Sequence, residues 1–311
     1  MELTRGIYAE PEDTVLTTRA LEYLATGPAD VVDLIGHICS LPRAPRIVAE
    51  HMAHAMFAGR REFVRQSDGR WMLSGLAAFG YAAGPETSPF SRTVSANGSD
   101  HLCNLSYVVV DTETTGGRAF FGDRITEIAA VVVRNGEIID VYETLVNPQR
   151  PIPPFVSRLT NITWSMVKDA PTFDRIAPKL MSVLQGNVFV AHNAGFDWRF
   201  VTQELSRTAG HRLRGRKLCT VKLARKILPQ LSRRSLDHIA RYYGVEITRR
   251  HRAGGDALAT AKCLIRMIAD LSDRGCSTWE DLDFLLGRSS AKRRKRRAPA
   301  LPHPVTKDTT A

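Results

Sequence analysis

The stretch YVVVDTETTGG, from Tyr107 to Gly117, places two carboxylates at the end of a run of valines. Such a run is typical of a buried strand, and side chains at i and i+2 of a strand point to the same face. Asp111 and Glu113 are therefore expected to lie side by side. Two neighbouring carboxylates repel each other unless a cation lies between them. The stretch predicts a divalent metal site at the end of a strand.

The composition is that of a globular protein long enough for two domains, with 311 residues and 43% apolar content. No apolar run approaches the roughly 20 residues that span a bilayer. The first 30 residues lack the apolar core of a signal peptide, so we expect a cytoplasmic protein without membrane contact. The five cysteines are scattered without CxxC spacing, which favours free thiols over disulfides or a zinc site.

The formal net charge of +11 is unevenly distributed along the chain. Residues 288–311 carry eight Lys or Arg against one Asp (+7), and residues 105–287 carry 26 basic against 19 acidic residues (+7). Residues 1–85 carry eight basic against ten acidic residues (−2), and residues 86–104 carry one against two (−1). The basic central and C-terminal regions favour a polyanionic partner.

A segment rich in Ser, Pro and Gly, PETSPFSRTVSANGSDH, divides the chain. We predict a small N-terminal module over residues 1–84, a linker over 85–104, a larger domain over 105–287 and a disordered basic tail over 288–311. The tail has a block of six basic residues and too little apolar surface to fold. It is interpreted either as a tether for nucleic-acid phosphates or as a solubilising tail.

The N-terminal module is predicted to contain helices over residues 14–25, 29–39 and 46–58, followed by a hairpin across Asp68-Gly69. This order resembles a winged helix-turn-helix domain. The resemblance implies that Arg60, Arg61, Arg65 and Arg70 lie where DNA phosphates would be contacted. A helical module that docks a protein is the alternative, which the net charge of −2 favours.

The central domain alternates predicted strands and helices. Strands are expected over 106–110, 128–133 and 138–146, the last two joined by an Asn135-Gly136 turn. A short strand over 188–191 leads into a helix from about Phe196, and further helices are expected over 236–243 and 255–271. This pattern predicts a mixed α/β domain.

Two later stretches supply further candidate ligands. VFVAHNAGFDWRF places Asp197 at the start of a helix, and HRAGGDALATA places His251 five residues before Asp256. A phosphodiester site that uses hard metal ions needs several oxygen ligands and a group that takes a proton from water. The alternatives are that Asp197 caps its helix and that His251 is structural.

The motifs DTETTG, HNAGFD and HRAGGDA, in this order, resemble the three motifs of the DEDDh family of 3′-to-5′ exonucleases, typified by the epsilon subunit of bacterial DNA polymerase III. The resemblance covers residues 105 to about 272 and includes LVNPQRPIPP, RLTNITWSMV and CTVKLARKILP. It implies an RNase H-like α/β fold, a mixed sheet flanked by helices. The N-terminal module and the basic tail depart from the epsilon layout.

The resemblance also implies roles for particular residues. Asp111, Glu113 and Asp256 would hold one metal ion, Asp111 and Asp197 a second one, and His251 would act as the general base. The residues implied to contact the terminal nucleotide are Thr114, Thr115, Gly116, His192, Asn193 and Phe196, although His192 and Asn193 also fit purely structural roles. Two Mg²⁺ or Mn²⁺ ions are expected because all the ligands are carboxylates.

The leading prediction is a metal-dependent 3′-to-5′ exonuclease that acts on DNA in proofreading or repair, with a DNA polymerase or another replication or repair protein as partner. One alternative is a 3′-to-5′ exoribonuclease that trims RNA, and no feature of the sequence decides between the two substrates. The other alternative is a catalytically silent nucleic-acid-binding or scaffold protein. The complete set of five catalytic residue types argues against this last reading.

Overall fold

The computed structural model describes residues 6–41, 44–60, 62–74 and 100–287, and these residues form two compact units. We call the first the sheet unit, formed by residues 6–8, 100–204 and 215–287. The second, the helical unit, is formed by residues 9–74 and 205–214. The predicted tail and most of the predicted linker lie outside the described residues. The predicted domain boundaries therefore stay predictions.

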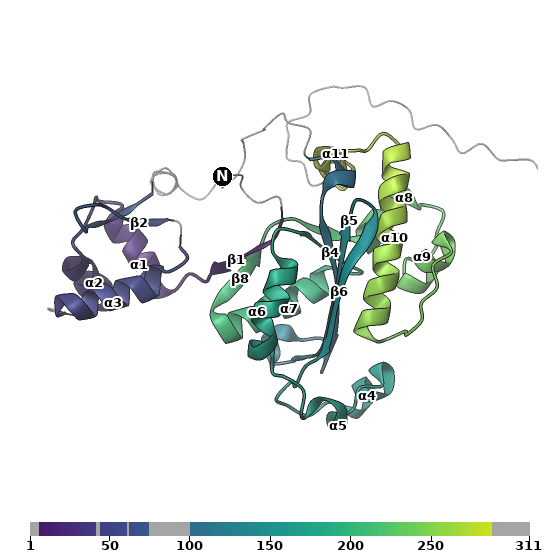
Figure 1. Cartoon of the computed structure of the whole chain (residues 1–311), viewed down its shortest axis with the longest axis horizontal. Coiled ribbons are helices and arrows are strands. Elements are labelled where there is room, and N and C mark those ends of the chain that lie inside the picture. The colour runs from purple at the N-terminus through teal and green to yellow at the C-terminus, as the bar shows by residue number, and fades with distance from the viewer. Residues whose placement is uncertain (1–5, 42–43, 61, 75–99, 288–311) are drawn as a thin grey trace, which may run out of the picture. The chain divides into compact units, whose positions relative to one another are not determined.

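The sheet unit contains a five-stranded mixed sheet in the order β6-β5-β4-β7-β9 (Figure 1). Its strands are β4 (Tyr107–Thr114), β5 (Ile125–Arg134), β6 (Glu137–Leu145), β7 (Val188–Ala191) and β9 (Lys217–Cys219). β4 pairs antiparallel with β5 and β5 with β6, whereas β7 is parallel to both β4 and β9. The predicted hairpin turn between β5 and β6 is confirmed, since Asn135 and Gly136 both have positive φ (51° and 77°), as a type I′ turn requires.

Helices cover both sides of this sheet. α8 (Thr220–Ile227), α9 (Leu236–Tyr243) and α10 (Ala253–Asp273) lie on one side of the strands, and α6 (Phe173–Leu184) and α7 (Gly195–Ala209) lie on the other (Figure 1). The core under α10 combines Tyr107 and Val109 of β4 with Ala257 and Leu264 of α10. The shorter helices are η2 (Ala119–Phe121), α4 (Pro154–Thr160), α5 (Trp164–Val167) and α11 (Trp279–Leu285), with η1 (Leu102–Asn104) before β4. The arrangement confirms the predicted mixed α/β fold.

The helical unit contains α1 (Val15–Leu24), α2 (Val31–Cys39) and α3 (Arg46–Phe57), followed by the hairpin of β2 (Phe63–Arg65) and β3 (Trp71–Leu73). Its other ladder joins β1 (Tyr8–Pro11) to β8 (His211–Arg214). Side chains of all three helices and the hairpin share one apolar core, which includes Leu24, Leu34, Phe57 and Leu73. The predicted order of three helices and a hairpin is confirmed, whereas membership of the winged-helix class stays a prediction.

One predicted phosphate contact in this unit is wrong. The Arg60 side chain is only 3% exposed and is held by the carboxylates of Asp13 (2.9 Å) and Glu62 (2.8 Å), so it is not free to meet DNA. Arg65 and Arg70 are exposed, but each is paired with a carboxylate, Arg65 with Glu50 at 2.6 Å and Arg70 with Asp68 at 2.8 Å. Arg61 lies outside the described residues.

Among the described residues, no helix is both long and apolar enough to cross a membrane.

Candidate active site

Asp111 and Glu113 continue the row of β4 side chains that faces α10. Tyr107 and Val109 of this row lie in the core beneath α10, and alternate residues of a strand share a face. Both carboxylates are partly buried, and Glu113 lies opposite Glu127 of β5 in the strand register. β4 therefore extends beyond its predicted end and holds both acids inside the hydrogen-bonded ladder.

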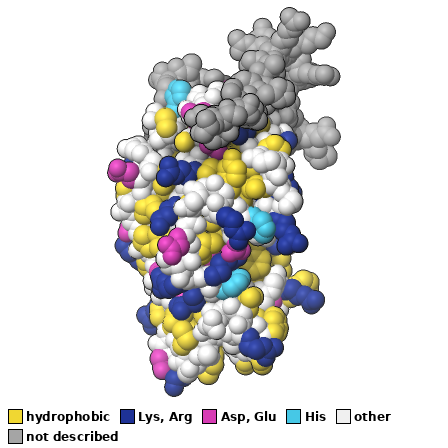
Figure 2. Space-filling model, turned by 90° about the vertical axis from the view of Figure 1, so that its right-hand side faces the viewer, with side chains coloured by type: hydrophobic (Ala, Val, Ile, Leu, Met, Phe, Trp, Pro, Cys, Tyr) yellow, Lys and Arg dark blue, Asp and Glu magenta, His cyan; other side chains and the backbone are white. Residues whose placement is uncertain are grey.

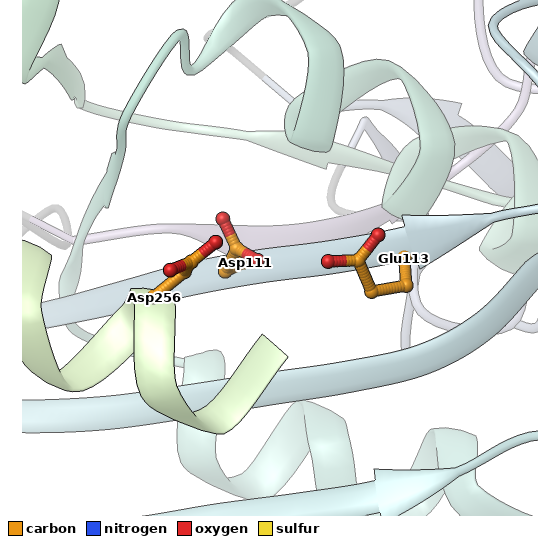
Figure 3. A group of neighbouring side chains, drawn as sticks. All are labelled: Asp111, Glu113 and Asp256. Carbon is orange, nitrogen blue, oxygen red and sulfur yellow. The ribbon is translucent and has the colours of Figure 1, made fainter. Parts of the chain in front are cut away.

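The first turn of α10 brings a third carboxylate to the same place. Asp256 is 4% exposed, and its carboxylate lies beside those of Asp111 and Glu113 (Figure 3). One oxygen from each of the three residues lies within 4.8 Å of the others. This spacing matches a group of ligands that share one cation. Residues that are separated by more than 140 positions in the chain thus meet at one point.

Asp197 lies near this group but is held differently. It is in the first turn of α7, directly after β7, which is parallel to β4. Its carboxylate is 3% exposed and accepts a hydrogen bond from Thr112 Oγ1 (2.9 Å). Asp197 is outside the three-carboxylate group, but its negative charge contributes to raising the pKa of Asp111. The structure therefore brings all four predicted acids together.

Burial raises the pKa values of all four acids, and repulsion by neighbouring carboxylates adds to the shift for Asp111 and Glu113. Burial, followed by the charges of Asp197 and Glu113, holds the pKa of Asp111 well above its usual range. Burial and then the charge of Asp256 raise the pKa of Glu113 to about 7. Burial also raises the pKa of Asp256 and that of Asp197. A cation bound between such groups would remove the repulsion and favour their ionised forms.

The donor set fits a divalent metal ion. Asp256 Oδ1 is buried and has no hydrogen-bond partner among the described residues, although buried polar atoms are nearly always paired. The donors brought together are carboxylate oxygens, which are the ligands that Mg²⁺ and Mn²⁺ prefer. Asp111, Glu113 and Asp256, with Asp197 beside them, are therefore able to hold such ions.

His251 lies in the turn that precedes α10. It has a φ of 58°, which is uncommon for a residue other than glycine, and its N–H donates to Asp256 Oδ2 (3.3 Å). The preceding Arg250 donates to Asp237 (2.9 Å) and also pairs with Asp256. The turn thus holds His251 next to the carboxylates through the backbone. Its role as general base stays a prediction.

Glu127 is a residue of this site that the sequence reasoning missed. Its side chain is buried, with 1% of the residue exposed. It accepts hydrogen bonds from Arg252 Nε (3.1 Å to each oxygen) and from the Ala253 N–H (2.8 Å). Arg252 is the N-cap residue of α10 and Ala253 its first residue. Glu127 therefore fixes the end of the helix that carries Asp256. Its position within the apolar stretch ITEIAAVVV was the available signal.

A second missed pair lies at the start of β5. Arg124 donates to both oxygens of Glu204 on α7 (2.7 and 2.9 Å), and Glu204 is 1% exposed. Arg124 also exchanges backbone contacts with Thr115, whose N–H donates to the Arg124 carbonyl (2.8 Å). The pair therefore connects α7, which carries Asp197, to the loop that follows Glu113.

The threonine side chains of this loop, which were predicted to contact the substrate, are buried and bonded within the protein. Thr115 is 1% exposed, and its Oγ1 accepts a hydrogen bond from the Arg124 N–H (3.0 Å). Thr114 Oγ1 donates to the Gly116 carbonyl (2.6 Å). A side chain at Gly116 would collide with the carboxylate of Asp123. Substrate contact by this loop stays a prediction, and it would involve mainly the backbone.

His192, Asn193 and Phe196 lie around the end of β7. His192 Nδ1 is 2.9 Å from Thr220 Oγ1, and burial, with the charge of Arg250, lowers its pKa to about 4. Its ring is therefore neutral at physiological pH. Asn193 is exposed with a φ of 74°, and the Phe196 ring packs on that of Phe200. Their contact with substrate also stays a prediction.

Comparison with known proteins agrees with this geometry. The exonuclease family model matches residues 108–264. The chain is 39% identical over 180 residues to a PolC-type DNA polymerase III of Caldanaerobacter subterraneus. That alignment covers 58% of this chain and 13% of the polymerase. It is 38% identical over 244 residues to a putative bifunctional exonuclease/endonuclease protein of Mycobacterium tuberculosis, and this alignment covers 73% of this chain and 38% of that protein. The chain thus spans between about an eighth and two fifths of the length of these two relatives.

Solved nuclease structures also align with the chain. Exonuclease X in complex with 5′ overhanging duplex DNA is 30% identical, with a TM-score of 0.47, and the match covers 59% of this chain and 99% of that one. The family model includes the strand that bears Asp111 and Glu113, the start of α7 and the first turn of α10. The chain therefore belongs to the exonuclease family, which confirms the DEDDh-type membership predicted for its central domain.

Proposed function

We propose that this protein is a metal-dependent 3′-to-5′ exonuclease that releases nucleotides from the 3′ end of DNA. The observation that carries the proposal is the meeting of Asp111, Glu113 and Asp256, whose carboxylate oxygens lie within 4.8 Å of one another. The name of the PolC-type relative supports DNA as the substrate, because it describes a DNA polymerase.

In the proposed mechanism, Asp111, Glu113 and Asp256 would hold one divalent ion, and Asp111 and Asp197 would hold a second. Bound ions would lower the pKa of the attacking water and neutralise charge on the leaving 3′ oxygen. His251 takes the proton from the water as general base. Its position is maintained by the N–H contact to Asp256 and by the helix end that Glu127 anchors.

The surface charge supports a polyanionic substrate. α8 exposes Lys222, Arg225 and Lys226, and no ion pair involves them within the part of the chain that the structure describes. Arg233 and Arg241 are likewise exposed near α9. Figure 2 shows Lys and Arg side chains spread over the face that carries α9. Unpaired cations of this kind attract phosphates and make binding sensitive to salt.

A time course on 5′-labelled substrates tests this function. Single-stranded DNA, duplex DNA and RNA of matched sequence would be incubated with Mg²⁺ or Mn²⁺, with an Asp111→Ala variant beside the wild type. We expect a ladder that shortens from the 3′ end of DNA and is absent with the variant. A ladder on RNA alone would establish the exoribonuclease instead. Binding without cleavage of any substrate would contradict the enzymatic proposal.

We further propose a role in DNA proofreading or repair in the cytoplasm, with a polymerase or another replication or repair protein as partner. The names of the relatives, a DNA polymerase and an exonuclease/endonuclease protein, support this class of process. The pairing of Arg60, Arg65 and Arg70 with carboxylates favours docking of a protein by the helical unit over contact with DNA. This docking is tested by comparing the proteins that co-purify with the wild type and with an Ile47→Asp variant, since Ile47 is an exposed apolar residue of the helical unit. Loss of a replication or repair protein from the variant's co-purifying set is the expected result.

A further inference from the structure

Arg250 contacts acidic residues of two helices at once. Its Nε donates to Asp237 Oδ1 (2.9 Å) and its Nη2 donates to Asp237 Oδ2 (3.3 Å), so two donors hold this carboxylate. Its Nη1 donates to Asp256 Oδ2. Asp237 lies in the first turn of α9, and Asp256 lies in the first turn of α10. One guanidinium therefore connects a candidate metal ligand to a carboxylate outside the metal-ligand group.

The two carboxylates differ in their surroundings. The side chain of Asp237 is 47% exposed, whereas that of Asp256 is 6% exposed and lies beside Asp111 and Glu113 (Figure 3). A carboxylate in contact with water is well solvated, but a buried one needs a nearby cation to stay ionised. Among the described residues, Arg250 is the only arginine or lysine that forms an ion pair with Asp256. Asp256 therefore depends on a cation more strongly than Asp237 does.

The positive charge of Arg250 also acts on the other candidate ligands. Burial raises the pKa values of Asp111 and Glu113, and the charge of Arg250 acts on both in the opposite direction. The guanidinium thus favours ionised carboxylates, as a bound metal ion would. Two cations that are attracted to the same carboxylates repel each other, so the guanidinium opposes the binding of a divalent ion.

The contact with Asp256 leaves part of that carboxylate open. Arg250 and the His251 N–H both donate to Oδ2, whereas Oδ1 is buried and has no hydrogen-bond partner among the described residues. An ion could therefore reach Asp256 through Oδ1 while Arg250 is still on Oδ2. The competition is one between charges, and it ends when Arg250 gives up Oδ2 and keeps its two bonds to Asp237.

We propose that Arg250 competes with the divalent ion for Asp256 and that Asp237 retains the guanidinium when the ion binds. Arg250 is then a positioning residue that sets the metal affinity of the site without being a ligand. Because Arg250 directly precedes His251, its pair with Asp237 keeps hold of that turn after Asp256 is released. The proposal rests on the metal binding in the proposed function, and it is independent of which nucleic acid is cleaved.

Calorimetric titration of the full chain with Mn²⁺, in the absence of nucleic acid, tests the competition. The variants are Arg250→Gln, Arg250→Lys, Asp237→Asn and the double variant Asp237→Asn/Arg250→Gln. Arg249→Gln is the matched control, because Arg249 is the neighbouring arginine, is 52% exposed and pairs with Glu143 (3.1 Å). Circular dichroism would show that each variant is folded at the temperature of the titration.

Arg250→Gln should bind Mn²⁺ about tenfold more tightly than the wild type, because a neutral amide leaves the full charge of Asp256 to the ion. A tenfold change corresponds to about 1.4 kcal/mol. It is modest for two neighbouring cations because the Arg250 side chain is 33% exposed and water screens its charge. Arg250→Lys should remain close to the wild type, because lysine keeps the positive charge. Asp237→Asn should bind Mn²⁺ more weakly, because Arg250 then has only Asp256 as its partner.

The double variant isolates the role of Asp237. Its Mn²⁺ affinity should equal that of Arg250→Gln, because Asp237 acts through Arg250. If Asp237→Asn weakens Mn²⁺ binding equally with and without Arg250→Gln, Asp237 acts by its own charge and the proposed retention of Arg250 is overturned.

Three other results would overturn the competition. The first is unchanged or weaker Mn²⁺ binding by Arg250→Gln. The second is equally tight binding by Arg250→Gln and Arg250→Lys, because the gain would then come from the lost shape of the guanidinium and not from its charge. The third is an equal gain in Arg249→Gln, which would indicate a general effect of surface charge.

Thermal unfolding supplies a second measurement. The loss of Tm in Arg250→Gln should be larger in EDTA than in saturating Mn²⁺, because the ion replaces the missing cation beside Asp256. A loss of Tm that is the same in both conditions would contradict the competition.

Nucleotide release from 5′-labelled DNA and RNA by the same proteins separates this proposal from the proposed function. If Mn²⁺ affinity changes as expected but the wild type cleaves neither substrate, the exonuclease function fails and the competition stands. If the wild type cleaves DNA or RNA and all variants bind Mn²⁺ equally, the function stands and the competition is overturned. If neither the wild type nor Arg250→Gln binds Mn²⁺, both proposals are overturned.

Discussion

Replacing Glu127 with Gln should show that one buried carboxylate positions the helix of Asp256. Glu127 is 1% exposed and accepts hydrogen bonds from Arg252 and from the Ala253 N–H. Removing one member of a fully buried ion pair costs about 3–5 kcal/mol. The Arg252 side chain is 25% exposed, so water would partly solvate the guanidinium left behind. Glutamine also keeps one oxygen acceptor, and the lost charge relieves repulsion on Glu113.

These offsets reduce the expected loss in free energy of unfolding to about 2 kcal/mol. For a unit of this size, that loss corresponds to a fall in Tm of roughly 4–8 °C. A shift of the α10 end by about 1 Å should also lower turnover, by up to about 100-fold, because Asp256 is three residues after Ala253. Thermal unfolding by circular dichroism would measure the stability loss, and the rate of nucleotide release would measure turnover. Mn²⁺ titration by calorimetry would show whether metal affinity falls as well.

The matched control is Glu137→Gln, which changes the same group at an exposed position of β6. It should leave Tm and Mn²⁺ affinity unchanged. The double variant Glu127→Gln/Arg252→Gln should be no less stable than Glu127→Gln alone, because the unpaired guanidinium is then absent. A Glu127→Gln variant with the Tm and the Mn²⁺ affinity of the wild type would refute the anchoring role.

Three further predictions concern the same site. Because the pKa of Glu113 rises from 4.5 to about 7 and that of Asp111 is held well above its usual range, the folded metal-free chain binds more protons than the unfolded chain. Its stability should therefore fall as pH rises from about 4.5 to 7, and Mg²⁺ should restore most stability at the upper end; a Tm in EDTA that is flat between pH 5 and 8 would contradict this. His251→Ala should lower turnover about 10²- to 10⁴-fold while Mn²⁺ affinity measured by calorimetry stays within a factor of a few; a variant of near-normal rate would exclude the general-base role. Gly116→Ala should lower both Tm and activity, because its Cβ would lie 2.7 Å from Asp123 Cγ. Gly117→Ala is the control, because its Cβ would meet nothing within 4 Å. An equal loss of Tm and activity in the control would refute a steric cause.

The local elements of the sheet unit were predictable because their patterns repeat. The valine run of β4 and the apolar spacing of α10 each follow from the period of a strand or helix, and both elements were expected within a few residues of their observed limits. The Asn135-Gly136 turn followed from the positive φ values that only a few residue types adopt readily. The helical unit's element order was also predictable, but its arginine pairing was not. Arg60 meets Asp13, 47 positions away, and no local pattern records that contact.

The sequence by itself determined which residues could hold a metal ion, because Asp111, Glu113, Asp197 and Asp256 occur in three recognisable motifs at strand and helix ends. Only the tertiary structure decided how these motifs are held, since Glu127 binds the end of α10 from 126 positions away and Arg124 binds Glu204 from 80. Which residues pair in this way depends on how the strands and helices pack against one another. A buried charge is stable only where this packing brings an oppositely charged group next to it.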